Sequence, residues 1–288
     1  MFRRRIVTIA GRQRSSSTSE RLSLPPMLSR PDTPPPLLAR EIAEATGLSL
    51  PWVVEKLEQL ARDKFPVGRR DSMDLLDPTQ RERLIEALLI HETYFFRHPN
   101  QWRLLRSELP ALVERRPGAP LIAWSAGCST GEEAWSLAYL LVREGHSSSV
   151  IGTDISKSSI ATAAHGTYRR LERMGSLREI PDFAAADFPT RAGECWNARP
   201  DLHAMTRFIA LSLLETSPVS HADIVFCRNV MIYFSPAIVD ELIQRIAAIV
   251  PEGGILALGG AETLRSPTLF EPLYGDGAYL FRRNGTPA

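Results

Sequence analysis

The sequence has few cysteines and lacks the long apolar runs that cross membranes. Its three cysteines, Cys128, Cys195 and Cys227, show no CxxC spacing, and no secretory signal precedes them. They indicate reduced thiols in a cytoplasmic protein, not a disulfide framework or a zinc site. No apolar segment approaches the roughly 20 residues that a membrane helix needs, so no membrane insertion is expected. The six histidines show no metal-ligand spacing, and no residue is assigned to a metal.

The sequence also lacks a strong excess of charge, because its net charge is +1, but that charge is unevenly spread. Residues 1–36 hold seven arginines against Glu20 and Asp32, a local charge of +5, which leaves −4 for the remainder. This leader is too rich in Ser and Pro to pack, and we expect it to be disordered. A solvated tail and a docking arm for an acidic partner are both open interpretations. Because the remainder is acidic, nucleic-acid binding is disfavoured.

The glycine-rich segment at 124–133 lacks two motifs that would identify a phosphate ligand. WSAGCSTGEE has GxxxG spacing, not the GxGxxG of dinucleotide sites, and no lysine follows as in a P-loop. Instead Glu132 and Glu133 follow the loop, and negative charge there suits a cationic ligand. S-adenosylmethionine carries a sulfonium and an ammonium group and no phosphate. As an alternative, Ser129 with Glu132, or Thr130 with Glu133, fits a capping box for the following helix.

Strand-like and helix-like segments alternate from about residue 121 onward. Segments with helical spacing, at 132–144, 156–164 and 236–250, lie between short apolar runs that predict strands. Such alternation specifies an α/β sheet with helices on both faces. Residues 166–205 break the alternation and are interpreted as an insertion. The predicted strands are LIAWSA (121–126), SVIGTD (149–154), RFIAL (207–211), ADIVFC (222–227), GILALGG (254–260) and AYLFRR (278–283).

Residues 37–98 are predicted to form a small helical domain and a linker, without evident chemistry of their own. Gly47 fits the C-terminal cap of a first helix, and Pro51 fits the first turn of a second. Asp77-Pro78-Thr79-Gln80 fits an N-cap with Gln at position N3, the capping-box pattern. The remainder, 99–288, is expected to be one domain that contains the insertion.

Asp154 lies at the end of the second predicted strand, 23 residues past Gly131. An acidic side chain at this position commonly accepts hydrogen bonds from ribose hydroxyls. The alternative is an N-cap for the helix that begins near Ser156. Together, the glycine loop and Asp154 indicate a nucleoside-type cofactor and leave a dinucleotide open.

Six blocks of the sequence resemble the CheR family of chemotaxis receptor methyltransferases, and the resemblance extends over roughly residues 37–283. The resemblance implies a small all-α domain, then a class I methyltransferase domain of Rossmann-like fold with an inserted β-subdomain, and S-adenosyl-L-methionine as cofactor. The blocks occur in the family's order and at its spacing. They are ETYFFRHP (92–99), WSAGCSTGEE (124–133), GTDIS (152–156), DIVFCRNVMIYF (223–234), GG (253–254) and GGAETL (259–264).

The resemblance also implies a cofactor site assembled from several of these blocks. Two positions, His91 and Ser212, depart from the asparagine that is usual in the family, although both side chains can still hydrogen-bond. Tyr233 would border the substrate site, and Arg97 or Tyr233 would orient the incoming oxygen as catalytic residues. The implied cofactor contacts are His91, Thr93, Arg97, Gly127, Glu132, Asp154, Ser212, Leu213, Arg228 and Asn229.

Four further residues in these blocks are interpreted as packing residues. Phe95 and Phe96 are expected in the core, and Cys128 and Cys227 are expected to be small fillers beside the site, not nucleophiles.

The reaction that the resemblance implies is methylation of glutamate side chains on methyl-accepting chemotaxis receptors by a protein-glutamate O-methyltransferase. A glutamate has a pKa of about 4.3 and is already ionised at neutral pH, so the reaction needs no general base. The insertion would be a candidate site for a receptor-tail peptide. Two alternatives stay open: a CheR-like methyltransferase with a substrate outside chemotaxis, and a non-catalytic module that binds S-adenosylmethionine and signals through a partner. A nicotinamide oxidoreductase is a weaker alternative, because GxGxxG is absent.

Overall fold

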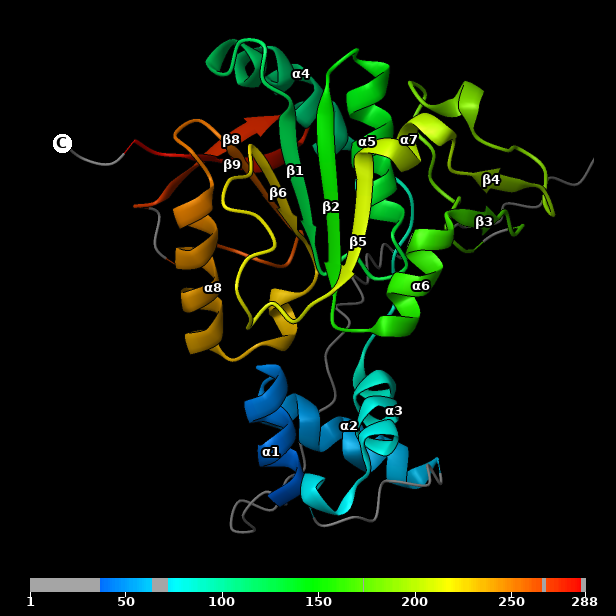
Figure 1. Ribbon diagram of the computed structural model, residues 1–288, viewed down its shortest axis with the longest axis vertical. Coiled ribbons are helices and arrows are strands. Elements are labelled where there is room, and N and C mark those ends of the chain that lie inside the picture. Colours follow the sequence, from blue (N-terminus) through cyan, green and yellow to red (C-terminus); the bar gives the residue numbers. More distant parts are fainter. Residues whose placement is uncertain (1–36, 64–71, 173, 266–267, 286–288) are drawn as a thin grey trace, which may run out of the picture. The chain divides into compact units, whose positions relative to one another are not determined.

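The computed structural model describes residues 37–63, 72–172, 174–265 and 268–285 (Figure 1). The predicted leader, 1–36, lies outside the described residues. Within them, no helix is both long enough and apolar enough to span a membrane.

The caps that the sequence predicts for the N-terminal helices are present in the structure. Gly47 follows the first helix with a left-handed φ of 74°, and its amide donates to the Ala43 carbonyl at 2.8 Å. Asp77 and Gln80 form both bonds of the predicted capping box. The helices share a small hydrophobic cluster that includes Ile42, and the domain boundary at residue 98 stays a prediction. The elements are α1 (Leu37–Thr46), α2 (Leu50–Arg62), the 3₁₀ turn η1 (Met73–Leu75) and α3 (Pro78–Leu88).

Seven strands form the large sheet, in the order β5-β2-β1-β6-β7-β9-β8. The first five in this order are parallel, and β9 runs antiparallel to both of its neighbours. This mixed sheet confirms the predicted α/β fold class, although β8 lies where no strand is predicted. The strands are β1 (Leu121–Ala126), β2 (Ser148–Asp154), β5 (Thr206–Ala210), β6 (Ile224–Cys227), β7 (Ile255–Leu258), β8 (Phe270–Gly275) and β9 (Ala278–Arg283).

Helices cover both faces of this sheet. Successive strand residues point to opposite faces, so each central strand packs against helices on both sides. In β6, Ile224 and Phe226 pack in one cluster with residues of α4 and α5, whereas Val225 and Cys227 pack in another with α8. Figure 1 shows α8 and α5 on opposite sides of the central strands. The helices are α4 (Pro99–Arg115), α5 (Glu132–Arg143), α6 (Lys157–His165) and α8 (Pro236–Ile249).

The insertion contains a two-stranded antiparallel sheet, β3 (Thr167–Arg169) and β4 (Cys195–Asn197), with the turn η2 (Ala185–Asp187) between the strands and α7 (Pro200–Met205) after them. Its aromatic side chains enter the same core as Phe95, whose ring centroid lies 4.7 Å from that of Trp196 and 5.0 Å from that of Tyr168. Phe95 and Phe96 are fully buried, so their predicted role as core residues is confirmed. Their packing fixes the linker segment that leads to Arg97.

Candidate functional site

A cavity of about 910 Å³, including its open mouth, lies at the carboxyl ends of the parallel strands. This edge is where open α/β sheets bind ligands. All but one of the predicted site residues line the cavity, and Glu132 is the exception. Those that line it are His91, Thr93, Arg97, Gly127, Asp154, Ser212, Leu213, Arg228, Asn229 and Tyr233.

The glycine loop after β1 folds back onto the end of β2. The amides of Gly127 and Cys128 both donate to the Thr153 carbonyl at 2.8 Å. Gly127 has a φ of 82°, and a Cβ there would lie 2.5 Å from Cγ2 of Val230 on the neighbouring loop. A side chain at this position would therefore clash, which explains the glycine that the sequence motif carries.

Asp154 ties this loop to the start of α6. Its carboxylate accepts the Ser129 amide at 2.8 Å and the Ser156 amide at 2.9 Å. Burial raises the pKa of Asp154, and the two amide bonds act against that rise. The N-cap of α6 is Ser156, whose hydroxyl accepts the Ser159 amide at 3.0 Å. Asp154 thus orders the cavity wall and does not occupy the N-cap position.

The two glutamates after the glycine loop do not cap α5, so the capping-box alternative is wrong. The N-cap is Gly131, with a φ of 97° and no side-chain cap bond. Glu132 is buried outside the cavity lining and accepts hydrogen bonds from the hydroxyls of Thr130 and Ser176 at 2.7 and 2.5 Å. Burial raises its pKa, against the effect of these two hydroxyls. A cofactor contact by Glu132 stays a prediction.

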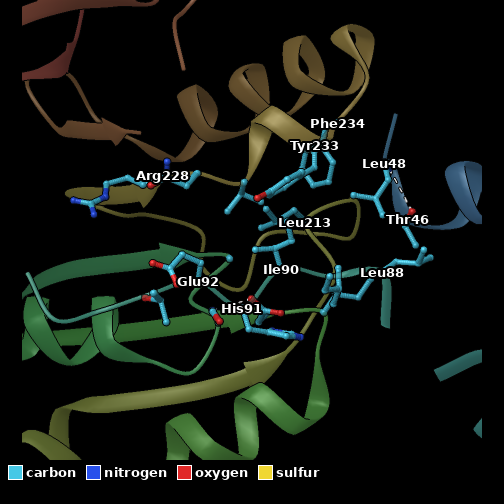
Figure 2. Close-up of a pocket in the computed structure, with 18 of the residues that line it drawn as sticks. Thr46, Leu48, Leu88, Ile90, His91, Glu92, Leu213, Arg228, Tyr233 and Phe234 are labelled. Atoms are coloured by element: carbon cyan, nitrogen blue, oxygen red, sulfur yellow. Dashed lines mark hydrogen bonds between the residues drawn. The ribbon is translucent and has the colours of Figure 1, made fainter. Parts of the chain in front are cut away.

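Arg228 lines the cavity, but its guanidinium is engaged elsewhere. It donates to the Arg97 carbonyl at 2.7 Å and to Gln101 Oε1 at 3.1 Å, and its Nε lies 3.1 Å from a Glu133 carboxylate oxygen. Figure 2 shows this side chain extending away from Tyr233 and Leu213. The side chain of Arg228 therefore holds the linker and α5 in place beside the cavity, a role that the sequence motif does not indicate.

Two side-chain oxygens of cavity residues, Ser129 Oγ and Asn229 Oδ1, are buried without a hydrogen-bond partner in the described part of the chain. Both residues hold left-handed backbone conformations, with φ values of 48° and 59°. Such strain in residues other than glycine gathers at functional sites, and unpaired buried polar atoms call for a partner. Hydroxyl and ammonium groups, as on an amino-acid nucleoside, match these atoms.

His91 and Arg97 reach the cavity from the linker before α4. The two His91 ring nitrogens lie 3.0 Å from Ser159 Oγ and 3.6 Å from a Glu86 carboxylate oxygen. The Arg97 guanidinium donates to the Glu92 carbonyl at 2.8 Å. Both side chains thus support the linker next to the cavity.

The N-terminal helices supply an apolar wall that the sequence does not predict. Trp52 of α2 lies with its ring centroid 4.7 Å from that of Tyr233. An isolated β-bridge joins Leu48 to Phe234, and the Ser49 amide donates to the Tyr233 carbonyl at 2.7 Å. Burial raises the pKa of Tyr233. Figure 2 shows Leu213 and Ile90 between Tyr233 and His91, so apolar and polar side chains meet across the cavity.

The sequence model of the CheR methyltransferase SAM binding domain matches residues 91–277, which include every residue predicted for the site. The chain belongs to the CheR methyltransferase family. The family match identifies S-adenosylmethionine as the cofactor, in agreement with a cavity that offers a carboxylate and unpaired polar atoms but no phosphate-binding loop.

Several curated proteins resemble this CheR family member. Chemotaxis protein methyltransferase 1 of Pseudomonas aeruginosa is 31% identical over 197 residues, which cover 65% of this chain and 71% of that protein. Putative methyltransferase Cher3 of Pseudomonas putida is 32% identical over 226 residues, which cover 73% and 80%. An uncharacterized 104.1 kDa protein of Rhodobacter capsulatus is 34% identical over 197 residues, which are 65% of this chain but 20% of that protein. The chain thus spans about a fifth of that relative's length.

Proposed function

We propose that this protein transfers a methyl group from S-adenosylmethionine to glutamate side chains of methyl-accepting chemotaxis receptors in the cytoplasm. Membership of the CheR family and the names of its relatives support the reaction class and the receptor. The observation that carries the proposal is the cavity itself, which Asp154, Ser129 and Asn229 line together with the apolar residues of the N-terminal helices. The insertion, with its β3–β4 sheet, is the proposed contact for a receptor tail.

In this proposal the cofactor is held by the polar wall of the cavity, which Ser129, Asp154 and Asn229 form at the strand ends. Bound S-adenosylmethionine supplies an activated methyl group on a sulfonium. Asp154 would accept hydrogen bonds from the ribose of the cofactor. Ser129 and Asn229 would offer their unpaired oxygens to the hydroxyl and ammonium groups of the cofactor. The loop that contains Ser212 and Leu213 borders the remaining part of the cavity.

The chain's own groups orient the substrate and exclude water, because an ionised glutamate needs no base to act as a nucleophile. Correct alignment of reacting groups lowers a barrier by about 7–11 kcal/mol. Tyr233 and Arg97 are the proposed orienting residues, since both line the cavity from separate segments. The apolar contact between Trp52 and Tyr233 limits hydration of the incoming carboxylate.

The test is transfer of a radiolabelled methyl group to purified receptor cytoplasmic fragments, followed by release of methanol in base. The proposal expects base-labile label that is lost when the receptor's acceptor glutamates are changed to alanine. Tyr233→Phe should lower turnover more than it lowers affinity for S-adenosylhomocysteine, with exposed Tyr274→Phe as control. Label on another protein would favour a different carboxylate substrate, and cofactor binding without any ester would favour a non-catalytic module.

A further inference from the structure

Glu262 belongs to the GGAETL block, which has no assigned role in the reaction. We propose that Glu262 is a positioning residue: its carboxylate fixes the loop after β6 that places Asn229 and Tyr233 at the cavity. The inference rests on the proposed methyl transfer, and it adds a residue that lies outside the cavity lining.

The Glu262 carboxylate is surrounded by main-chain donors. One oxygen accepts the amides of Asn229 at 2.8 Å and Gly259 at 2.6 Å. The other accepts the amides of Val230 at 2.9 Å and Met231 at 2.8 Å. The residue is only 5% exposed, so these four amides replace water around the charge. Hydrogen bonds to an ionised acceptor are about twice as strong as neutral ones.

The loop depends on this acceptor because its own backbone is irregular. Asn229 has a left-handed φ of 59° between β6 and the 3₁₀ turn η3 (Met231–Tyr233). Three successive amides, from residue 229 to residue 231, find their acceptor in one carboxylate from the loop after β7. Without that carboxylate they would be buried donors with no partner, which is costly.

The Asn229 side chain and the same carboxylate both lie against Gly259. A Cβ on Gly259 would lie 2.7 Å from Asn229 Nδ2 and 2.8 Å from Glu262 Oε2, so the three groups fit only because residue 259 has no side chain. The Asn229 amide oxygen is left buried without a partner at the cavity. Tyr233, at the end of the turn, meets Trp52. A displaced loop would move both the cofactor-facing amide and the tyrosine.

The test compares Glu262→Gln and Glu262→Asp with Glu271→Gln, a change at an exposed glutamate of β8. Glutamine keeps the shape, but its carboxamide NH2 group is a donor and cannot accept hydrogen bonds from two of the amides. Aspartate keeps the carboxylate on a shorter side chain. Two quantities are measured. The first is hydrogen exchange at the amides of residues 229–231 and 259. The second is kcat, divided by the fraction of molecules that bind S-adenosylhomocysteine in a calorimetric titration.

Glu262→Gln should lose protection at these four amides and lose about 10- to 100-fold in kcat. Its KM for S-adenosylmethionine should rise as well, because the same loop places Asn229. Glu262→Asp should fall between this variant and the wild type. Unchanged protection, or a kcat per competent molecule equal to that of Glu271→Gln, would overturn the inference. If Glu262→Gln does not fold, Glu262→Asp decides by the same two measurements. If the wild-type protein forms no ester, the proposed receptor reaction is refuted. The hydrogen-exchange data test separately whether Glu262 holds the loop after β6.

Discussion

The two walls of the cavity are built in opposite ways. The wall from the strand ends is polar, and both of its left-handed residues other than glycine donate their amides to carboxylates: Ser129 to Asp154, and Asn229 to Glu262. The wall from the N-terminal helices is apolar and is joined to Tyr233 by the Trp52 ring contact. The difference suggests a division of labour, in which the rigid polar wall recognises the cofactor and the apolar wall shields the substrate carboxylate from water.

The largest effect is expected from breaking the polar wall at Asp154. Asp154→Ala removes the acceptor of two backbone amides and the proposed ribose contact, and each hydrogen bond to a charged group contributes about 1.5–3 kcal/mol. The affinity for S-adenosylhomocysteine should fall by about 100-fold or more, as measured by calorimetric titration. Asp240→Ala, at an exposed position on α8, is the control and should bind as the wild type does. An affinity for Asp154→Ala within threefold of that control would contradict the division.

A smaller effect of a different kind is expected from the apolar wall. Trp52→Ala removes an aromatic pair with Tyr233, and such pairs contribute about 0.5–1.5 kcal/mol. Turnover should fall by about 3- to 10-fold while the affinity for S-adenosylhomocysteine stays the same. Trp52→Phe should restore most of the turnover, and Leu75→Ala, at an exposed residue of η1, controls for general effects on the helices. Equal losses of affinity and turnover in Trp52→Ala would show that the walls do not divide these tasks.

The polar wall could be predicted from the sequence, and the apolar wall could not. Gly127 directly follows one strand that a local apolar pattern predicts, and Asp154 is the last residue of another. Parallel strands bring their carboxyl ends to one edge. Trp52 belongs to a helix that the pattern also predicts, but its contact with Tyr233 depends on how distant segments pack. The acceptor role of Glu262 depends in the same way on tertiary structure, although its sequence block was visible.

Two of the elements that the sequence pattern did not predict, α4 and β8, contain proline. Pro110 stands inside α4, where proline normally argues against a helix interior. Pro272 stands in β8, which is the edge strand of the sheet and can therefore tolerate a residue without an amide donor. The insertion was predicted as a break in the alternation, whereas its aromatic packing against Phe95 follows only from the fold.

A small gain in cofactor affinity is expected from Ser212→Asn, a change in the lining of the cavity. Ser212→Asn introduces the residue that is usual in the family at a position on the cavity lining. An amide offers a donor and an acceptor where the serine hydroxyl already accepts the Leu214 amide at 3.2 Å. One added hydrogen bond contributes about 0.5–1.5 kcal/mol, so affinity for S-adenosylhomocysteine should rise by about 2- to 10-fold. Ser217→Asn, on the same loop outside the lining, should leave it unchanged. A loss of affinity in Ser212→Asn would show that the loop has adapted to serine.

The smallest effect concerns the buried carboxylate beside the polar wall. Burial raises the pKa of Glu132 above its ordinary value of 4.5, so the folded state holds this proton more tightly than the unfolded chain does. The stability that follows is present at low pH and is lost as the pH rises through the raised pKa. Glu132→Gln cannot titrate, so its free energy of unfolding relative to the wild type should increase between pH 5 and pH 7 in urea titrations.

Asp201→Asn is the matched control for this pH dependence, because the Arg199 guanidinium lowers the pKa of Asp201 below its ordinary value of 3.8. That group is ionised in both states throughout the range, and the difference between its variant and the wild type should stay constant from pH 5 to pH 7. A constant difference for Glu132→Gln as well would mean that the hydroxyls of Thr130 and Ser176 offset the burial of this charge. Glu132 would then be a third carboxylate held in place by hydrogen bonds next to the cavity, besides Asp154 and Glu262.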